Sequence, residues 1–259
     1  MKTSSAGAAR KTAERVYGLA AAQAAFAARP EAVTSIAYTA ALRRPLADML
    51  RAAARRRIAY REVDAEELTR MAQSVHHEGV CLLVAARPTP KPSELLRGLG
   101  ASGLLLALDG VENPHNIGAI LRSAAYFGAR GLIYTTSDKA AQADGLLPAA
   151  ARRIAEGGAE HVPVLRVPQL SSLLREATNE GIVAIACDAH AQARLDDFEW
   201  PARALLVLGH EQRGLSRETQ AQCQASVRIA GSQQLESLNV SVAAGIFLAS
   251  YARAHGAGR

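Results

Sequence analysis

The sequence has few of the residues that build disulfide frameworks, metal centres and aromatic cores. Only 3 of its 259 residues are cysteine, and they lie far apart without a C-x-x-C pair. Cysteines that are scattered and odd in number argue against a disulfide framework, and we expect no metal site. Aromatic residues make up only 4% of the chain, while alanine, leucine and valine dominate. This composition favours helices and buried strands over an all-β sandwich.

Long apolar runs are also missing. No stretch reaches the roughly 18 apolar residues that a membrane-spanning helix needs, and the N-terminal MKTSSAGAARKTAER lacks the apolar core of a secretory signal. We therefore expect no membrane association and a cytoplasmic location. Apolar residues still make up 49% of the chain, which is enough to bury a core.

Lysine is scarce in a chain whose net charge is +6, so nearly all of the positive charge is arginine. The guanidinium group binds phosphate through two parallel hydrogen bonds, and a basic balance favours a nucleic-acid partner. A codon bias towards alanine and arginine is the alternative explanation. The lysines are Lys2, Lys11, Lys91 and Lys139.

Two stretches with an α/β pattern follow a short tail. Residues 1–11 are small, polar and basic, and we expect them to be disordered. Residues 12–86 alternate between helix and strand patterns and predict a small α/β domain. The predicted helices are Glu14–Ala28, Pro45–Arg56 and Asp64–Gln73, and the predicted strands are Ser35–Thr39, Ile58–Arg61 and Val80–Ala85.

A proline-rich segment, residues 87–102, is the predicted linker between the two stretches. Its RPTPKPSE sequence holds three prolines in eight residues, so we expect it to be extended and fairly stiff. Residues 103–259 alternate again, and their strands are continuously apolar, as in a parallel sheet covered on both faces. The predicted strands are Leu104–Leu108, Gly131–Thr135, Val162–Val167, Ile182–Cys187, Ala204–Leu208 and Ser226–Ile229, and the predicted helices are Ile117–Phe127, Pro148–Glu156, Gln169–Asn179, Arg217–Gln222 and Leu238–Ala254.

Polar residues gather where three of these strands end, and open α/β sheets bind ligands at such ends. The first group lies in VENPHNIGAILRSA, where Asn116 can cap a helix. Arg122 lies off the apolar stripe of that helix, on the same side as Gly118. We expect the missing side chain of Gly118 to leave a gap that a ligand or a second chain enters. A plain cap and a solvated charge are the alternatives for Asn116 and Arg122.

The second group lies in LLVLGHEQRGLS. Gly209 ends a buried strand, Glu211 follows it, and Ser216 caps the next short helix. Gly209 and Gly214 let the backbone approach a ligand or turn sharply. An ordinary strand–helix turn with a surface glutamate is the alternative.

The third group lies in VRIAGSQQLESLNVSVA, where Ser237 is a natural N-cap for a long helix. Asn239 has no such explanation, because asparagine is a poor helix former. Three polar groups at strand ends predict one shared pocket. No G-x-G-x-x-G follows a strand, so a nucleotide-dependent oxidoreductase is disfavoured.

Three motifs in this order, N-P-x-N-x-G-x-x-x-R-[ST]-A, L-G-x-E-x-x-G-L and S-L-N-V-S-V-A, resemble those of the SpoU (TrmH-type) RNA ribose 2′-O-methyltransferases of the SPOUT class. The match covers roughly Leu104 to Ala254. The resemblance implies an α/β fold whose C-terminal SPOUT-type parallel sheet, residues 103–259, contains a deep trefoil knot. Residues 12–86 look like the family's small ribosomal-protein-like domain that binds the RNA substrate.

The same resemblance implies S-adenosylmethionine as methyl donor, ribosomal or transfer RNA as substrate, and a homodimer formed through the C-terminal domain. It assigns catalytic and donor-binding roles by position. The catalytic positions are Asn116, Arg122, Glu211, Ser237 and Asn239, and the donor-binding positions are Leu208, Gly209, Val227, Ile229, Gly231 and Leu238.

The implied reaction moves a methyl group from a sulfonium to a ribose hydroxyl, so the enzyme must align both and remove the hydroxyl proton. Family mechanisms often make the arginine the base, although a guanidinium holds its proton to a pH above about 12. Two roles therefore stay open for Arg122, a base or a cation that binds phosphate and stabilises the developing alkoxide. Glu211 then orients Arg122 or accepts the proton.

An arginine cluster in residues 12–86 is the predicted contact to the RNA backbone, and such contacts make affinity fall steeply with salt. A solvated helix face is the alternative for these residues. A non-catalytic RNA-binding or ribosome-assembly protein that keeps the fold is the alternative function. The cluster consists of Arg43, Arg44, Arg55, Arg56 and Arg57, with Arg51 and Arg61 beside them.

Overall fold

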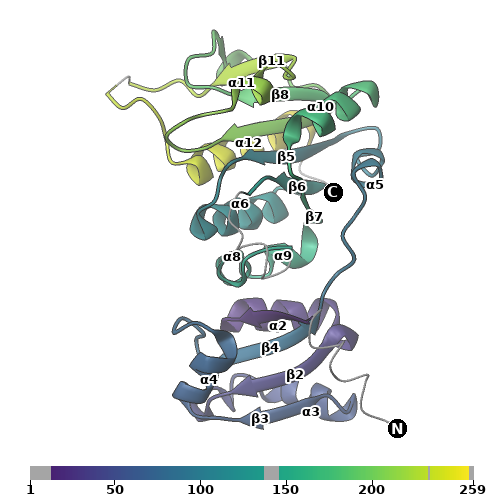
Figure 1. Cartoon of the computed structure of the whole chain (residues 1–259), viewed down its shortest axis with the longest axis vertical. Coiled ribbons are helices and arrows are strands. Elements are labelled where there is room, and N and C mark those ends of the chain that lie inside the picture. The colour runs from purple at the N-terminus through teal and green to yellow at the C-terminus, as the bar shows by residue number, and fades with distance from the viewer. Residues whose placement is uncertain (1–12, 137–145, 233, 257–259) are drawn as a thin grey trace.

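The computed structural model describes residues 13–136, 146–232 and 234–256. Within these ranges a four-stranded sheet forms the N-terminal domain, and a seven-stranded sheet forms the C-terminal domain (Figure 1). The predicted disordered tail, residues 1–11, lies outside the described residues. Among the described helices, none has both the length and the apolar character that crossing a membrane requires.

The N-terminal domain is a mixed sheet with helices on both faces. Its elements are β1 (Ala13–Tyr17), α2 (Leu19–Ala28), η1 (Pro30–Ala32), β2 (Val33–Tyr38), η2 (Ala40–Leu42), α3 (Ala47–Arg55), β3 (Ala59–Glu62), α4 (Ala65–Ala72) and β4 (Val80–Ala85). The strand order is β1-β4-β2-β3, with β4 antiparallel to both neighbours and β2 parallel to β3. Helices α2 and α3 pack on one face, and α4 packs on the other.

The predicted helix Glu14–Ala28 is wrong in its first part, because Ala13–Tyr17 form the edge strand β1. Valine and tyrosine favour extended backbone, and Val16 and Tyr17 are both buried there. Gly18 then adopts a φ of 91°, which ends the strand, and the helix begins at Leu19. The alanine-rich sequence after Gly18 is a strong helix former, and it conceals this break in the sequence pattern.

The C-terminal domain is built on an all-parallel sheet. Its strands are β5 (Gly103–Asp109), β6 (Gly131–Tyr134), β7 (Val164–Arg166), β8 (Val183–Cys187), β9 (Ala193–Arg194), β10 (Arg203–Gly209) and β11 (Ala225–Arg228). Its helices are α6 (Pro114–Tyr126), α8 (Ala149–Ile154), α9 (Gly158–His161), α10 (Leu170–Asn179), η3 (Leu195–Asp197), α11 (Arg217–Gln220) and α12 (Val240–His255). Every described strand pair in this sheet is parallel, as predicted.

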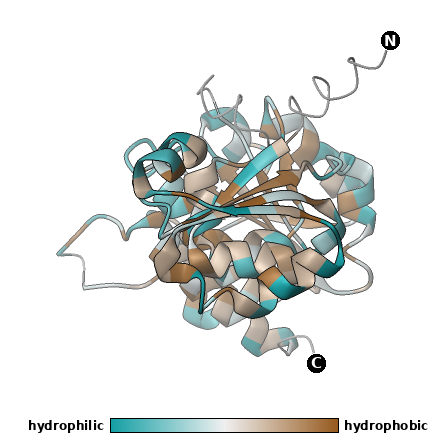
Figure 2. Ribbon diagram, turned by 90° about the horizontal axis from the view of Figure 1, so that it is seen from below, coloured by the Kyte–Doolittle hydropathy of each residue, from teal (hydrophilic) through white to brown (hydrophobic). Residues whose placement is uncertain are grey.

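The central strands are apolar on both faces, because each face packs against helices. Leu104, Leu106 and Leu108 of β5 pack against α6 and α12, whereas Leu105 and Ala107 pack against α10 on the opposite face. Figure 2 shows hydrophobic residues along the strands in the interior of the view. This two-sided burial explains why the strands read as continuous apolar runs rather than alternating patterns.

The strand order is β7-β6-β5-β10-β8-β11-β9. The chain moves outward from β5 through β6 to β7, and then continues on the other side of the sheet with β8. Strand β10 enters later between β5 and β8, so the carboxyl ends of β5, β10, β8 and β11 lie side by side. A reversal of strand order of this kind places a ligand site at those ends. The knot implied by the resemblance stays a prediction.

The predicted linker is extended only in part, because it contains the helix α5 (Pro92–Arg97). Pro92 occupies the first turn, where a helix needs no N–H from that residue. The N–H of Lys91 donates to the Glu94 carboxylate at 3.1 Å. Leu95 and Leu96 are buried against the C-terminal sheet. The third proline of the segment therefore begins a helix instead of preventing one.

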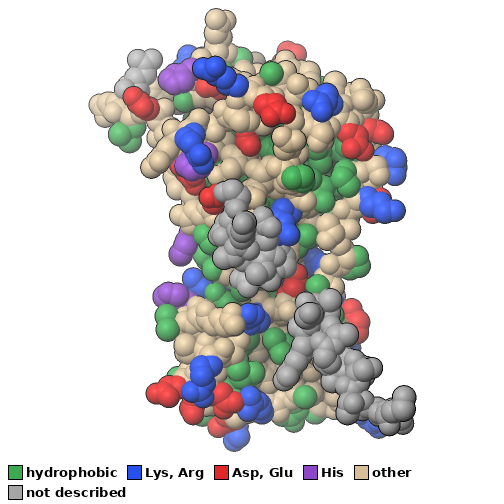
Figure 3. Space-filling view, in the orientation of Figure 1, with side chains coloured by type: hydrophobic (Ala, Val, Ile, Leu, Met, Phe, Trp, Pro, Cys, Tyr) green, Lys and Arg blue, Asp and Glu red, His purple; other side chains and the backbone are tan. Residues whose placement is uncertain are grey.

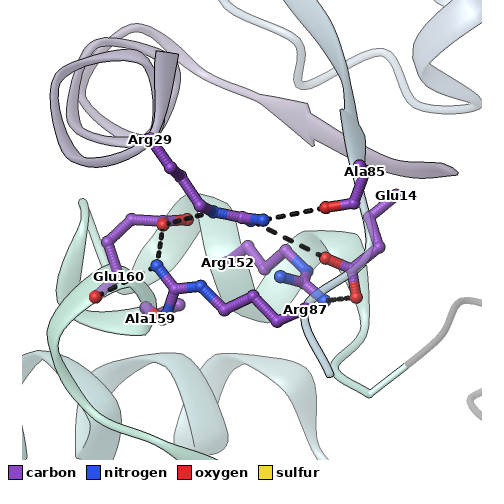
Figure 4. A network of polar contacts seen from close by, with 7 residues as sticks. All are labelled: Glu14, Arg29, Ala85, Arg87, Arg152, Ala159 and Glu160. Carbon is purple, nitrogen blue, oxygen red and sulfur yellow. Dashed lines mark hydrogen bonds and ion pairs between the residues drawn. The ribbon is translucent and has the colours of Figure 1, made fainter. Parts of the chain in front are cut away.

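A buried cluster of charged side chains joins the two domains (Figure 4). Arg152 of α8 donates to Glu14 of β1 at 2.6 Å, and Arg29 donates to Glu160 of α9 at 2.9 Å. Arg87 of the linker binds the same Glu160 carboxylate and the backbone of α9. The carboxylate side chains are only 5% and 4% exposed. We call Glu14, Arg29, Arg87, Arg152 and Glu160 the interdomain network.

Helix α8 also covers the β1 edge of the N-terminal sheet. Ala149 packs against the apolar cluster that contains Tyr17. Arg153 of the same helix pairs with Glu78 at 3.0 Å, and Glu78 accepts a hydrogen bond from the N–H of Leu19 at the start of α2. Figure 1 shows α8 and α9 between the two sheets. The N-terminal domain is therefore fixed against these two helices.

Candidate active site

Three segments that are far apart in the sequence meet at the carboxyl ends of the parallel strands. Asn116 lies in the first turn of α6, Glu211 lies just after β10, and Asn239 lies just before α12. The Asn116 amide nitrogen donates to Glu211 Oε1, and the Asn239 amide nitrogen donates to Asn116 Oδ1 at 3.2 Å. The structure therefore brings together one residue from each of the three motifs.

The backbone of α12 fixes the direction of this chain of hydrogen bonds. Asn239 Oδ1 accepts from the N–H groups of Ser241 and Val242 at 2.9 and 3.4 Å. Because a backbone N–H only donates, the oxygen of Asn239 must face the helix and its NH₂ must face Asn116. The NH₂ of Asn116 then faces Glu211 in turn. Both amides hold a unique orientation, and Glu211 accepts at the end of the chain.

The second oxygen of Glu211 is less engaged. His210 Nδ1 lies 3.9 Å from Glu211 Oε2, and the same nitrogen accepts a hydrogen bond from the N–H of Gln212 at 3.1 Å. A ring nitrogen that accepts from a backbone N–H carries no proton, so this contact is not an ion pair. Glu211 Oε2 thus remains open for a proton donor that enters the site. The Glu211 side chain is 28% exposed.

The two asparagines differ from the predicted caps. Asn113, not Asn116, is the N-cap of α6, and its side chain accepts from the N–H of His115. Asn239, not Ser237, is the N-cap of α12. Asparagine is unfavourable inside a helix but favourable as a cap, which explains Asn239. Ser237 is exposed and lies two residues before this cap. Because Asn113 is the cap, the Asn116 side chain does not cap the helix. It is buried and contacts Glu211 and Asn239.

The loop after β10 folds tightly back on Gly209. An ideal Cβ on Gly209 would lie closer than 3.0 Å to backbone atoms of Gly214 and Leu215. His210 and Gly214 also exchange two backbone hydrogen bonds, at 3.0 and 2.8 Å. The predicted sharp turn is confirmed, and the backbone that approaches Gly209 is that of its own loop. The Ser216 cap is confirmed as well, since its Oγ accepts from the N–H of Thr219.

Arg122 lies apart from this hydrogen-bond chain in the described structure. Its guanidinium pairs with Glu156 at 2.8 Å, not with Glu211. The predicted gap beside Gly118 is filled from within the chain, because a Cβ there would lie 2.7 Å from the Ala151 carbonyl oxygen of α8. The prediction of an open gap is therefore wrong. Gly118 instead allows α8 to pack closely on α6.

The positions assigned to the donor follow the strand ends. Leu208 and Val227 are buried, Gly209 and Ile229 are half-buried, and Gly231 and Leu238 are exposed. A Cβ on Gly231 would meet nothing within 4 Å, so space is open at that point. Neutral and mainly apolar residues of this kind fit a cationic donor that carries a flat aromatic ring. The described residues of the loop after β11, on either side of residue 233, project from the body of the molecule (Figure 1).

The five predicted RNA-binding arginines, in and around α3, are exposed. Arg43 forms an ion pair with Glu62 at 3.0 Å. Arg57 has a φ of 59°, a left-handed conformation that ends the helical segment after α3. Basic and acidic side chains lie together at this end of the molecule (Figure 3). The positive surface is thus interrupted by carboxylates.

Two groups of functional interest carried no signal in the sequence. Glu156 is the ion-pair partner of Arg122, and it lies 34 positions away on the segment that joins α8 to α9. The interdomain network draws on residues spread from Glu14 to Glu160. Nothing in the local sequence around these residues links them, because no motif or periodic spacing connects them. The E-G-G stretch at 156–158 was the only available hint of an unusual backbone.

The sequence matches two known protein families. The SpoU rRNA methylase family matches residues 103–249. A family described as RNA 2′-O ribose methyltransferase substrate binding matches residues 15–90. The fold and site thus define an RNA methyltransferase of the SpoU type. The chain belongs to the SpoU rRNA methylase family, as the motifs predicted, and the family uses S-adenosylmethionine as its methyl donor.

Curated relatives and solved structures agree with this assignment. The chain is 35% identical over 239 residues to the protein named uncharacterized tRNA/rRNA methyltransferase YfiF of Escherichia coli O157:H7, covering 92% of this chain and 68% of that protein. It is 35% identical to an uncharacterized tRNA/rRNA methyltransferase of Mycolicibacterium gilvum, covering 80% of this chain and 66% of that protein. The chain thus spans about two thirds of the length of these relatives.

A solved structure covers nearly the whole chain. It is the SpoU methyltransferase AviRb from Streptomyces viridochromogenes in complex with the cofactor AdoMet. The TM-score is 0.77 at 25% identity, and the match covers 99% of this chain and 96% of AviRb. The likeness therefore extends over both domains.

Proposed function

We propose that this protein transfers a methyl group from S-adenosylmethionine to the ribose 2′-hydroxyl of a ribosomal or transfer RNA. The observation that carries the proposal is the junction of Asn116, Glu211 and Asn239 at the carboxyl ends of the parallel strands. The description of the family that matches residues 15–90, which names RNA 2′-O ribose methyltransferases, supports the ribose as target.

The reaction forms a bond between the ribose oxygen and the methyl carbon, breaks the bond from that carbon to sulfur, and releases the hydroxyl proton. When bound, the donor supplies an electrophilic methyl group. Leu208, Gly209, Val227, Ile229, Gly231 and Leu238 are the residues that would hold it. Glu211 accepts the hydroxyl proton on Oε2, because its Oε1 is already engaged by Asn116.

Arg122 acts as a cation rather than as a base. Its guanidinium keeps its proton at physiological pH, so it binds the phosphate beside the target ribose and stabilises negative charge that develops on the ribose oxygen. Asn116 and Asn239 hold their loops and the ribose by neutral hydrogen bonds. Ser237, exposed two residues before α12, contacts the substrate or the donor.

The enzyme acts as a homodimer that pairs through the C-terminal domain. Tyr126 of α6 is 82% exposed, and Val242 and Ile246 of α12 are 52% and 37% exposed. The two helices pack side by side where Gly245 meets Ser123. Their exposed apolar side chains form a face that a second copy would cover. Arg122 lies on α6 beside this face. A partner subunit that covers the face would therefore also lie next to the Arg122 side chain.

The N-terminal domain holds the RNA through Arg43, Arg44, Arg55, Arg56 and Arg57. Because these contacts are made to phosphates, RNA affinity falls steeply as salt is raised. Salt-independent binding would contradict this part of the proposal. We infer a cytoplasmic location from the proposed RNA substrate.

The test compares ribose methylation across total RNA from strains with and without the gene. The proposal expects at least one ribose position to lose its methyl group in the strain without the gene and to regain it when purified protein and donor are added. RNA that is unchanged between the strains, together with no donor binding in calorimetry, would favour the non-catalytic RNA-binding alternative.

The role of Arg122 is tested by two substitutions. Arg122→Ala should lower kcat by about 10²- to 10³-fold, as removal of a stabilising donor does in other enzymes. Arg122→Lys retains the positive charge and should keep a measurable part of the rate. Near-normal turnover of Arg122→Ala would refute the role.

A further inference from the structure

The segment from α8 to α9 packs against the helix that carries Arg122. An ideal Cβ on Gly118 of α6 would lie 2.7 Å from the Ala151 carbonyl oxygen. In the opposite sense, a Cβ on Gly158 of α9 would lie 2.8 Å from the Leu121 carbonyl oxygen and 3.1 Å from the Arg122 Cα. Gly118 thus lets α8 pack closely on α6, and Gly158 lets α9 pack closely on the backbone of α6 about one turn later, at Leu121 and Arg122.

Glu156 lies in the middle of this segment and has an unusual backbone. Its φ is 46°, the left-handed region that residues other than glycine rarely adopt. The next residue, Gly157, also has a positive φ, of 95°. A glutamate held in this conformation costs about 1 kcal/mol or more, and such strain persists only where the surroundings impose it.

The strained backbone directs the Glu156 side chain to Arg122. Glu156 Oε2 lies 2.8 Å from Arg122 Nη2, and the two side chains are 46% and 60% exposed. An exposed ion pair adds little to the free energy of folding. Its effect is instead to restrict where the guanidinium lies. Arginine has five N–H groups, so a partner at one terminal nitrogen leaves others for an incoming phosphate.

The same segment is fastened on its other side to the N-terminal domain. Arg152 binds Glu14, Arg153 binds Glu78, and Glu160 binds Arg29 and Arg87. These contacts lie three and four residues before Glu156 and four residues after it. The backbone at Glu156 is therefore held from both ends, which is the constraint that its left-handed conformation requires.

We propose that Glu156 is a positioning residue that holds the Arg122 guanidinium in place for the RNA phosphate, and that the fastened α8–α9 segment holds Glu156. The proposal rests on the role of Arg122 under Proposed function. It differs from one of the two sequence-based expectations for Glu211, that Glu211 orients Arg122, and agrees with the other, that Glu211 accepts the proton. It leaves Glu211 available to take the proton.

The experiment uses the full chain with tritium-labelled S-adenosylmethionine and unmodified ribosomal and transfer RNA from a strain lacking the gene. Glu156→Gln keeps the size of the side chain and the backbone strain but removes the charge. It should lower kcat about 3- to 10-fold, because an exposed ion pair restricts its partner only modestly. Donor affinity measured by calorimetry should not change. Glu156→Asp keeps the charge and should recover part of the rate.

A matched control and a double variant separate positioning from general damage. Asp196→Asn removes a similarly exposed ion pair, Arg194–Asp196 at 3.0 Å, in another part of the C-terminal domain, and should leave kcat unchanged. Glu156→Gln in an Arg122→Ala background should have no further effect on kcat, since Glu156 acts only through Arg122.

The outcomes distinguish this inference from the proposed function. If Arg122→Ala lowers kcat but Glu156→Gln leaves it unchanged or raises it, the positioning role of Glu156 is wrong and the role of Arg122 stands. If the two substitutions lower kcat independently in the double variant, the positioning role is also wrong. If Arg122→Ala has normal turnover, both ideas are refuted together.

Discussion

The interdomain network and the candidate active site are both polar clusters assembled from distant segments, yet they use opposite chemistry. The network places two carboxylates and the guanidinium groups of Arg29 and Arg152 almost out of reach of water, while Arg87 at its edge is 33% exposed. The site uses two neutral amides and a single carboxylate that is 28% exposed. Opposite charges buried on both sides of the interface hold the two domains together. The neutral amides of the candidate site orient one another without adding charge to it.

The network has a cost that the site avoids. Removing charged groups from water is unfavourable, and only close partners offset it. Burial lowers the pKa of Arg87 from its ordinary value, and the carboxylate of Glu160 opposes this shift. Some atoms remain without a hydrogen-bond partner among the described residues, including Glu14 Oε2 and Arg152 Nε. A cluster of this kind fixes one docking geometry, and removal of any one partner leaves an uncompensated charge.

The largest effect should come from the turn beneath the site, where Gly209→Ala forces a Cβ into the backbone of Gly214 and Leu215. Backbone cannot move aside as a side chain does, so we expect a loss of more than about 4 kcal/mol in the free energy of unfolding. Urea unfolding or the yield of soluble protein measures it. Gly231→Ala, where a Cβ meets nothing within 4 Å, is the matched control and should change stability little. Equal stability of the two variants would contradict the tight turn.

The next effect should fall on the network. Glu160→Gln keeps the shape of the side chain but removes the carboxylate that both Arg29 and Arg87 bind, while Arg29 keeps its longer contact to Glu14 at 3.9 Å. Breaking a buried pair in this way costs about 3–5 kcal/mol, which we expect as weakened docking of the N-terminal domain. Limited proteolysis of residues 87–91 and urea unfolding measure it. Donor binding to the C-terminal domain should persist. A linker as resistant as in the unmodified protein would show that the network does not hold the domains.

A glutamate-to-glutamine substitution at Glu211, in the candidate active site, should lower activity and leave stability nearly unchanged. Glu211→Gln retains an oxygen to accept from Asn116 but loses the base, so we expect kcat to fall about 10²- to 10³-fold. Stability should change little, because the side chain is partly exposed and its hydrogen bond survives. Single-turnover methylation and urea unfolding supply the two readings. A variant that is destabilised but active would reverse the assignment of the two clusters.

The smallest effect concerns one thiol in each domain. Burial raises the pKa of Cys81 and of Cys223 from 9.0 to about 11. Each raised pKa favours the folded state fully below pH 9.0, and this contribution is lost as the pH rises through about 11. Because only the thiolate reacts, iodoacetamide at pH 8 should modify both cysteines slowly in the native protein and rapidly in urea. Fast labelling of Cys81 alone would show that the N-terminal domain opens independently.

Local signals allowed much of the fold to be predicted. The strands of the parallel sheet were visible as apolar runs, and caps such as Asp64 and Ser216 were visible because one residue and its neighbours determine them. The segment at Glu14–Tyr17 was not, because its pairing with β4 is set by residues about 70 positions away. The three motifs correctly predicted that polar residues from separate strand ends meet, as Asn116, Glu211 and Asn239 do.

Other features could not be predicted from the sequence, most of them because residues far away in the chain determine them. The cap of α6 is a different case, because Pro114 at the first helical position is a local signal that the cap is Asn113. The gap expected at Gly118 depended on what lies opposite, and that is α8, more than 30 residues later. Glu156 belongs to the same case, since a glutamate in an ordinary helix would have pointed elsewhere. Long-range packing, not residue type, decided the outcomes at Gly118 and Glu156.

The covering of β1 by α8 has a practical consequence for anyone who divides this chain. Among the described strands, β1 is an edge strand whose neighbour is β4. Its other edge faces α8 of the C-terminal domain. A fragment that ends before residue 103 would uncover that edge together with Glu14 and Arg29. Exposed strand edges pair with one another, so the isolated N-terminal domain should self-associate into aggregates. Any affinity of this domain for RNA is then best measured in the full chain.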